Sequence, residues 1–283
     1  MNKCKRIIVL IFFLFLGLII IKASNALSST LRYGMSSDLT RYAVITATNF
    51  SIAFIIGLMN WLSARFISKE PLENIGWYLS ESPARLFLAG FALTGVIAGA
   101  TISLSIAQFA ISFELGTSLR ITAGLITLTA FSGLFQCAGE ELWMRSWFLS
   151  NFALLIGRRY AVILTGLIFG LMHFLNPAYS WLGALSAALA GIMFSVGFFK
   201  TRSIIIPIGL HYGWNLVMGI FFNRQIFRLS SPLLTNINQF TAAEGTWWGV
   251  LLVLAGTLFV ASHYSDGFFR PLLNKNLHDS PSI

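Results

Sequence analysis

Two adjacent carboxylates and a guanidinium interrupt an otherwise largely apolar stretch, CAGEELWMRSWF, that runs from Cys137 to Phe148. On a helix, Glu141 and Arg145 are four residues apart, so they share one face and can neutralise each other. Glu140 points about 100° away, so it must face a cavity, a water molecule or another helix. A glutamate that reaches water in such a place is a candidate general base. The alternative is that all three side chains only join helices through polar contacts.

A histidine lies at a matching depth. The sequence favours a turn at 157–160, and Glu140 and His173 lie at similar distances before and after it. At about 1.5 Å rise per residue, such a helical hairpin brings both groups to nearly the same level. A glutamate and a histidine that face each other inside a membrane could together activate a water molecule. The alternative is a structural histidine that caps a helix before Asn176 and Pro177.

A second histidine is followed by an asparagine at helical spacing. His211 and Asn215 are four residues apart and lie on one face of a helix. Both side chains can donate hydrogen bonds, and converging donors are what an oxyanion needs when a carbonyl is attacked. We expect Pro207 and Gly209 to loosen this helix where it lines a polar cavity. The alternative is ordinary hydrogen bonding between helices.

The composition identifies the elements that must position these groups. Of the 283 residues, 56% are hydrophobic and 10% are charged, and the mean hydropathy is +0.77. This is more apolar surface than one soluble core of this size can bury. The sequence therefore predicts an all-α fold, a polytopic membrane bundle of about eight transmembrane helices. The expected spans are 7–21, 42–62, 86–112, 128–156, 161–175, 182–199, 204–222 and 247–264.

The distribution of charge predicts topology. The net charge of +9 comes from lysines and arginines at the ends of apolar runs, so we expect contact with lipid headgroups and not with nucleic acid. Counted by alternate loops, roughly two thirds of the 19 basic residues fall on the side of the amino terminus. We therefore expect an integral protein of the cell (plasma or inner) membrane with both termini cytoplasmic. The first run is expected to be an uncleaved anchor, and the segment near 70–84 to lie in the headgroup layer.

Three motifs occur in order on successive apolar segments: Glu140-Glu141-x-x-x-Arg145, Phe169-x-x-x-His173 and His211-x-x-x-Asn215. This arrangement resembles the CAAX prenyl protease and bacteriocin-processing family, also called Abi, which comprises multi-span intramembrane proteases. The resemblance covers roughly 117–222. It divides the chain into N-terminal spans at 1–116, a catalytic core at 117–222, and a last span with a polar tail at 223–283.

The resemblance implies a role for each motif residue. Glu140 would activate the attacking water with His173, and His211 and Asn215 would form the oxyanion site. Glu141, Arg145 and Phe169 would support them. The expected enzyme is thus an intramembrane endopeptidase whose partners are the lipid bilayer and a peptide or membrane-protein substrate; the oligomeric state is left open.

Two matters stay open at this level. Members of the family are often labelled metalloproteases, and Glu140, His173 and His211 could hold zinc. A metal-free mechanism is preferred, because asparagine is an unusual zinc ligand and the helical His-Glu-x-x-His motif is absent. The rival functions are a transporter or proton relay that uses the same buried groups, and a peptide-binding immunity or scaffold protein on the same fold.

Overall fold

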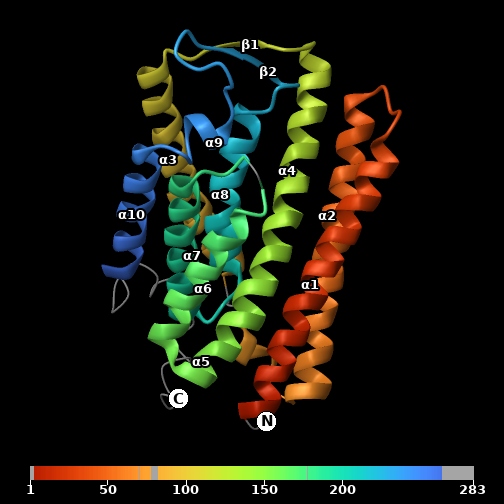
Figure 1. The fold of residues 1–283 in the computed structure, drawn as a ribbon, viewed down its shortest axis with the longest axis vertical. Helices are drawn as coiled ribbons and strands as arrows, with labels where there is room; N and C mark the ends of the chain where they lie inside the picture. The colour runs from red at the N-terminus through yellow and green to blue at the C-terminus, as the bar shows by residue number, and fades with distance from the viewer. Residues whose placement is uncertain (1–2, 70, 78–81, 177, 263–283) are drawn as a thin grey trace.

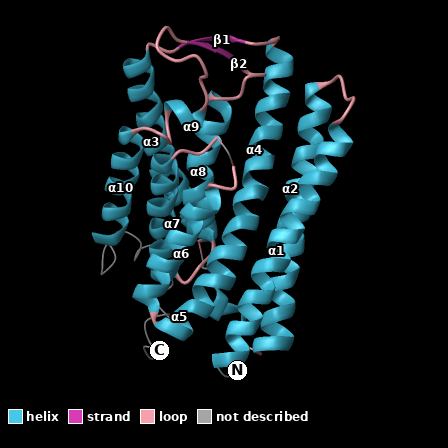
Figure 2. Ribbon diagram, viewed as in Figure 1, coloured by secondary structure: helices cyan, strands magenta, loops and turns pink. Residues whose placement is uncertain are grey.

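The computed structural model describes residues 3–69, 71–77, 82–176 and 178–262 of the chain (Figures 1 and 2). Helices account for most of it. Their bounds are α1 Lys3–Arg32, α2 Asp38–Leu62, α3 Pro83–Phe109, α4 Leu119–Glu141, α5 Ser150–Ile156, α6 Arg158–His173, α7 Trp181–Thr201, α8 Ile205–Phe221, α9 Gln239–Ala242 and α10 Trp247–Ser262. Two π-helical segments follow α2 and α4, at Ser63–Ser68 and Leu142–Leu149.

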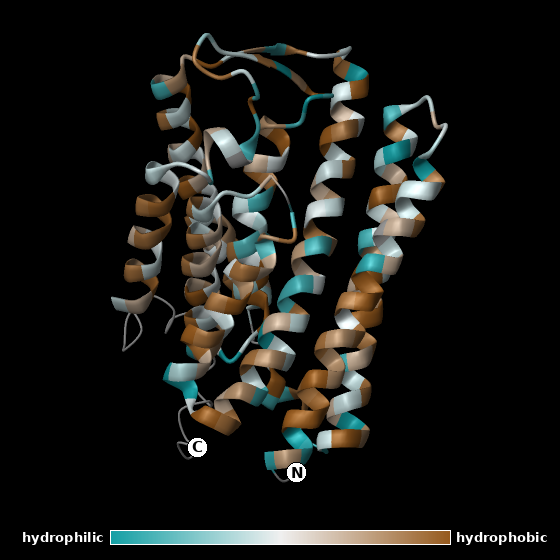
Figure 3. Ribbon diagram, in the orientation of Figure 1, coloured by the Kyte–Doolittle hydropathy of each residue, from teal (hydrophilic) through white to brown (hydrophobic). Residues whose placement is uncertain are grey.

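The fold is the predicted all-α membrane bundle. Within the described part of the chain, five helical stretches are long and apolar enough to cross a membrane, namely Lys3–Arg32, Asp38–Ser68, Pro83–Phe109, Leu119–Ile156 and Trp181–Thr201. Hydrophobic positions dominate the helices in Figure 3, and large apolar side chains such as Phe12, Phe54 and Val96 are exposed where lipid would cover them. The chain is therefore an integral membrane protein. Each of the eight expected spans falls on a helix, but Ile205–Phe221 and Trp247–Ser262 are short, so the number of spans stays a prediction.

A small sheet caps one end of the bundle. Strand β1 (Ser112–Leu115) pairs antiparallel with β2 (Phe227–Ser230), with Glu114 opposite Arg228. The expected span 86–112 was therefore slightly too long, since its last residue is already in β1. At the other end, a short 3₁₀ helix at Leu72–Ile75 and a bridge between Trp77 and Ser203 follow α2. The segment near 70–84 does not span where it is described; residues 70 and 78–81 lie outside the described part, as do residues 263–283 of the predicted tail.

The helix that carries Glu140 and Glu141 changes its winding directly after them. The α4 helix continues through the π-helical segment Leu142–Leu149 into α5 without a break. Every side chain from Trp143 to Leu149 is buried. A π-helical turn shifts the phase of a helix and often occurs at functional sites. Here it lets a bulky run of Trp, Met, Arg and Phe turn inward immediately beyond the two glutamates.

The next helix ends inside the bundle. With 16 residues, α6 rises about 24 Å, which is less than the roughly 30 Å of a hydrocarbon core. The carboxyl-terminal end of α6 consequently lies partway along the bundle (Figure 1). Non-helical backbone at such a depth is tolerated where it is buried in protein or lines a wet cavity. The loop after α6 is therefore an expected boundary of such a cavity.

Helix α8 is held against α3 by two glycines, and this corrects one expectation. Pro207 lies in the first turn of α8, where it breaks no helical hydrogen bond. A Cβ atom at Gly209 would overlap the carbonyl oxygen of Phe87, and one at Gly213 would overlap that of Phe91. Pro207 and Gly209 therefore do not loosen the helix. Gly209 and Gly213 allow the close backbone approach typical of small residues spaced four apart in membranes, and so orient the face that carries His211 and Asn215.

Gly209→Ala should lower the stability of the protein, because overpacking a tight helix crossing costs about 1–3 kcal/mol. The matched control is Gly99→Ala on α3, where an added Cβ meets no atom within 4 Å and alanine favours helix. Thermal unfolding in detergent micelles measures both variants. A Gly209→Ala protein that melts with the wild type would contradict the packing role.

Candidate active site

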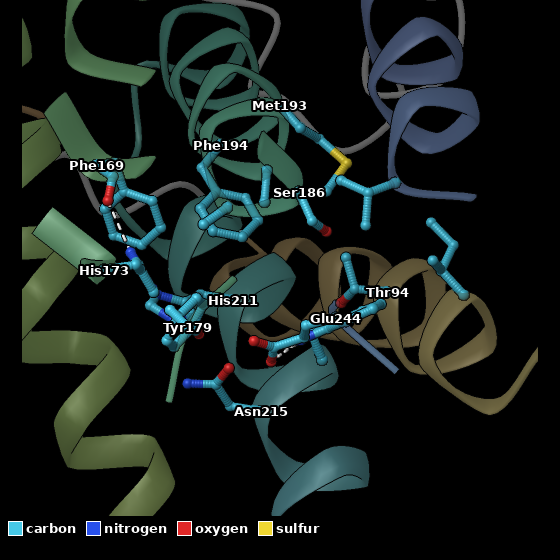
Figure 4. A pocket seen from close by; sticks show the side chains of 15 residues that line it. Thr94, Phe169, His173, Tyr179, Ser186, Met193, Phe194, His211, Asn215 and Glu244 are labelled. Carbon is cyan, nitrogen blue, oxygen red and sulfur yellow. Dashed lines mark hydrogen bonds between the residues drawn. The ribbon is translucent and has the colours of Figure 1, made fainter. Parts of the chain in front are cut away.

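One cavity is lined by the four side chains that the sequence predicts to be catalytic. It measures about 510 Å³, and Glu140, His173, His211 and Asn215 all line it. They come from α4, α6 and α8, with further wall residues from α1, α2 and α9. A smaller hollow of about 50 Å³ adjoins it behind His173, His211 and Asn215 (Figure 4). The space is large enough for several waters, which a hydrolytic reaction inside a membrane needs.

The predicted pair of Glu141 and Arg145 is confirmed. Arg145 Nη1 donates to Glu141 Oε1 at 2.9 Å, and neither side chain has any exposed surface. Arg145 Nη2 also donates to the carbonyl oxygen of Gly191 at 3.2 Å. The guanidinium lies 4.7 Å from the ring centre of Phe169 and 5.1 Å from that of Phe194. Arg145 is thus held inside the protein, and it does not line the cavity.

An interaction that the sequence did not predict joins this pair to α8. His211 Nδ1 lies 2.7 Å from Glu141 Oε1. Because that oxygen already accepts from Arg145 Nη1, it is an acceptor here and Nδ1 is the donor. The imidazole is stacked on Phe194, with 5.2 Å between ring centres, and meets Phe169 edge-on. Its remaining nitrogen, Nε2, therefore has a fixed direction, toward the cavity.

Glu140 is the accessible carboxylate. Its side chain is 31% exposed, and its Oε2 lies 3.9 Å from His211 Nε2. Gln136 Nε2, one turn earlier on α4, donates to Oε1 at 3.0 Å. As expected for a residue on a different face from Glu141, Glu140 points into the cavity. One oxygen is thus steadied by a neutral donor while the other faces the imidazole across a gap.

His173 has a defined tautomer. Its Nδ1 lies 2.7 Å from the carbonyl oxygen of Phe169. Since a carbonyl only accepts, Nδ1 carries the hydrogen and Nε2 presents a lone pair. The ring lies between Phe169 and Tyr179, at centre distances of 4.8 and 4.7 Å. The bond to its own helix is the capping contact of the structural alternative, but it also leaves Nε2 free to act as a base.

Asn215 has only a weak partner. Its Nδ2 donates to the Sγ atom of Cys137 at 3.4 Å, and sulfur is a poor acceptor. This amide can be redirected toward a substrate oxygen at small cost. Cys137 lies one turn before Glu140 and is fully buried.

Substitution of Cys137 should change how strongly the Asn215 amide is held away from a substrate oxygen. Cys137→Ser introduces a stronger acceptor, so any reaction that needs the Asn215 donor should slow roughly fivefold, as expected for about 1 kcal/mol of hydrogen bond. Cys137→Ala removes the acceptor and should leave the rate near that of the wild type. Cleavage rates of the two variants, compared at equal folded concentration, measure the difference. Equal rates for both variants would show that the contact does not restrain Asn215.

Glu244 and Tyr179 also line the cavity, and neither was predicted. Glu244, between α9 and α10, is 7% exposed and accepts from Trp214 Nε1 at 3.1 Å. Tyr179, in the loop after α6, donates to the same carboxylate; burial, then the charge of Glu244, raise the pKa of its hydroxyl. Glu244 escaped notice because it lies outside every expected span. Its isolation among apolar and small residues, Ala242-Ala-Glu-Gly-Thr-Trp247, was the available signal.

The nominated metal ligands do not form a metal cluster. Among the described residues, no three His, Cys, Asp or Glu side chains are grouped so that they could hold one ion. Glu140, His173 and His211 share the cavity walls, but their donor atoms do not converge as zinc requires. The residues present thus do not fit the zinc alternative.

Comparison with known proteins agrees with the motif pattern. Residues 122–217, about a third of the chain, match the family model "Type II CAAX prenyl endopeptidase Rce1-like". This confirms the resemblance to the CAAX prenyl protease and bacteriocin-processing family, and the matched segment contains all three motifs. Searches of curated proteins and of solved structures found no significant match. The family match supports a CAAX-type intramembrane peptidase in general terms.

Proposed function

We propose that this chain, whose residues 122–217 resemble the Rce1-like type II CAAX prenyl endopeptidases, hydrolyses peptide bonds inside the membrane. The observation that carries the proposal is the shared cavity of Glu140, His173, His211 and Asn215, within the segment that the family model covers. It places a carboxylate, an imidazole lone pair and two potential donors around one space that can hold water. In this proposal 117–222 is the catalytic core, although residues of 1–116 and 223–283 complete its walls.

The proposed reaction starts at Glu140. Its free oxygen takes a proton from a water molecule that the Nε2 lone pair of His173 helps to orient. The water oxygen attacks the carbonyl carbon of the scissile peptide, and the oxyanion accepts hydrogen bonds from His211 Nε2 and Asn215 Nδ2. When the carbon–nitrogen bond breaks, Glu140 returns its proton to the leaving nitrogen. Water is thereby divided between the two products, and the glutamate is restored.

This scheme requires a donor at both nitrogens of His211, and therefore an imidazolium. The contacts favour it, because Nδ1 touches Glu141 and Nε2 faces Glu140 across 3.9 Å. The four charges then balance: Arg145 neutralises Glu141, and the imidazolium neutralises Glu140. A balanced set is the least costly way to hold ionised groups inside a membrane protein.

The reaction is proposed to need no metal or other cofactor. Among the described residues, Glu140, His173 and His211 do not bring their donor atoms together as zinc ligands would. Glu140 as base, with His173, then provides the activation of water that a metal would otherwise supply. Chelation of the purified protein tests metal dependence directly, because cleavage by Glu140 and His173 should persist in the presence of a chelator.

The two rival functions predict different behaviour. A proton relay needs a connected chain of titratable groups across the membrane, whereas the described titratable cluster gathers around one cavity. A peptide-binding immunity or scaffold protein would use the same cavity without chemistry. The proposed location is the cell (plasma or inner) membrane with both termini cytoplasmic, as the distribution of positive charge indicates.

The proposed function is tested by reconstitution in liposomes with a mixed peptide library. The library contains apolar membrane peptides, leader-like peptides, and peptides that end in a CAAX tetrapeptide, each with and without a prenyl group. Mass spectrometry identifies products, and liposomes without protein are the control. Defined cleavage products that depend on the protein support the proposal. Peptide binding without products, or proton flux in the same liposomes, would support a rival instead.

A further inference from the structure

Glu244 and Tyr179 lie beside the four proposed catalytic side chains, yet no motif includes them. Figure 4 shows both next to His173, His211 and Asn215. They come from different loops: Tyr179 from the turn between α6 and α7, and Glu244 from the turn before α10. Both line the large cavity and the smaller hollow. The contact between them therefore joins two loops at the edge of the proposed site.

Tyr179 completes the surroundings of His173. The imidazole meets the ring of Phe169 on one side and the ring of Tyr179 on another, each in an edge-to-face geometry. Phe169 belongs to the same helix and moves with it, but Tyr179 lies six residues further on, in a loop. Without a tether, that loop ring could leave the imidazole. The hydrogen bond from the Tyr179 hydroxyl to Glu244 is such a tether.

Glu244 extends the tether to the helix with the donor pair. Its Oε1 accepts from Trp214 Nε1 at 3.1 Å, and Trp214 directly precedes Asn215 on α8. The carboxylate is 7% exposed, so its charge relies on these neutral donors more than on water. One buried group thereby connects the loop that touches His173 with the helix that holds His211 and Asn215.

We propose that Glu244 and Tyr179 are positioning residues that hold His173 at a fixed place relative to His211 and Asn215. Neither residue is assigned any bond-making step. Their effect is on geometry, and displacements of about 1 Å at a reacting group can cost a hundredfold in rate. The inference rests on the proposed function only for its kinetic consequence, since the placement of the histidine can be measured separately.

The simpler alternative is that the pair only stabilises the loops. It predicts that variants melt earlier while the folded protein behaves as the wild type does. Three variants separate the two ideas. Glu244→Gln keeps the shape but offers a single acceptor oxygen for two donors, Tyr179→Phe keeps the ring and removes the tether, and Tyr179→Leu removes both. Glu73→Gln, at an exposed glutamate of the 3₁₀ helix after α2, is the matched control.

The experiment uses the full-length protein in detergent and two measurements. The first is the rate at which diethyl pyrocarbonate modifies His173, read by peptide mass mapping with a free histidine-containing peptide in the same reaction as reference. The second is the steady-state cleavage of the best peptide from the library. Glu244→Gln and Tyr179→Phe should each raise the labelling rate of His173 several-fold and lower kcat about tenfold, with KM unchanged. Tyr179→Leu should exceed both, and the double variant Tyr179→Phe/Glu244→Gln should be no worse than Glu244→Gln alone.

Each contrary result is informative. Unchanged labelling of His173 in all three variants overturns the positioning role, even if activity falls. Raised labelling with an unchanged kcat overturns its importance for the reaction. If the wild type cleaves no peptide, the proposed function fails, but the labelling result still decides whether the pair fixes His173. If Glu244→Gln does not fold, Tyr179→Phe, which only loses one oxygen atom, carries the test.

Discussion

Glu140→Gln should reduce the rate of peptide-bond cleavage by about 10²–10⁴-fold, the usual contribution of a general base. Glutamine keeps the shape of the side chain, and its carbonyl oxygen can still accept from Gln136 as Glu140 does at 3.0 Å. It cannot take a proton from water. Because Glu140 is partly exposed in the cavity, the change should leave the melting temperature close to that of the wild type.

The measurement is the initial rate with the best-cleaved peptide, at equal concentrations of folded protein. Glu73→Gln changes the same residue type at an exposed position away from the cavity and should retain full activity. A Glu140→Gln protein with more than a tenth of the wild-type rate would remove Glu140 from the role of base. His173, whose Nε2 lone pair faces the same space, would then be the candidate.

Arg145→Met should destabilise the protein by about 3–5 kcal/mol, because it leaves a buried carboxylate without its counter-charge. Glu141 has no exposed surface, so water cannot replace the guanidinium. The change also removes the donor to Gly191 and the contacts with the rings of Phe169 and Phe194. Methionine is only slightly smaller than arginine, so little packing volume is lost and the effect is mainly electrostatic.

A second variant separates charge from packing. Glu141→Gln/Arg145→Met removes both charges and should recover much of the lost stability, since a neutral pair needs no counter-ion. Its activity should nevertheless stay low, because the glutamine oxygen can still accept from His211 Nδ1 but lacks the negative charge that, 2.7 Å away in the wild type, stabilises the imidazolium. Thermal unfolding and cleavage rates are measured together, with Arg120→Met at the exposed start of α4 as control. Recovery of both stability and activity would show that the charge of Glu141 is not needed beside His211.

Much of the site could be predicted because it depends on local helical spacing. Glu141 and Arg145 are four residues apart on one helix, and the structure joins them as expected. The hairpin of α4–α5 and α6 brings Glu140 and His173 to one cavity, because the chain is helical on both sides of the turn and residue counts approximate depth even through the π-helical segment. The all-α bundle followed from hydropathy alone, since a chain in lipid must satisfy its backbone internally.

The remainder depends on which helices become neighbours, and local spacing does not contain that information. The bond between Glu141 and His211 crosses from α4 to α8, 70 residues apart. Gly209 was interpreted as a loosened turn, whereas it is a contact with α3, because glycine serves both purposes. Glu244 was not predicted because a polar group signals a site by its cost only inside a span, whereas Glu244 reaches the cavity wall from the loop before α10.

The central claim is that Glu140 and its neighbours activate water without a metal. The most direct measurement is cleavage of a single peptide by the chelator-treated wild-type protein in ¹⁸O-labelled water, followed by mass spectrometry of the products. Cleavage should persist, and one ¹⁸O atom should enter the new carboxyl terminus. Loss of cleavage on chelation, with recovery when zinc is restored, would contradict the claim.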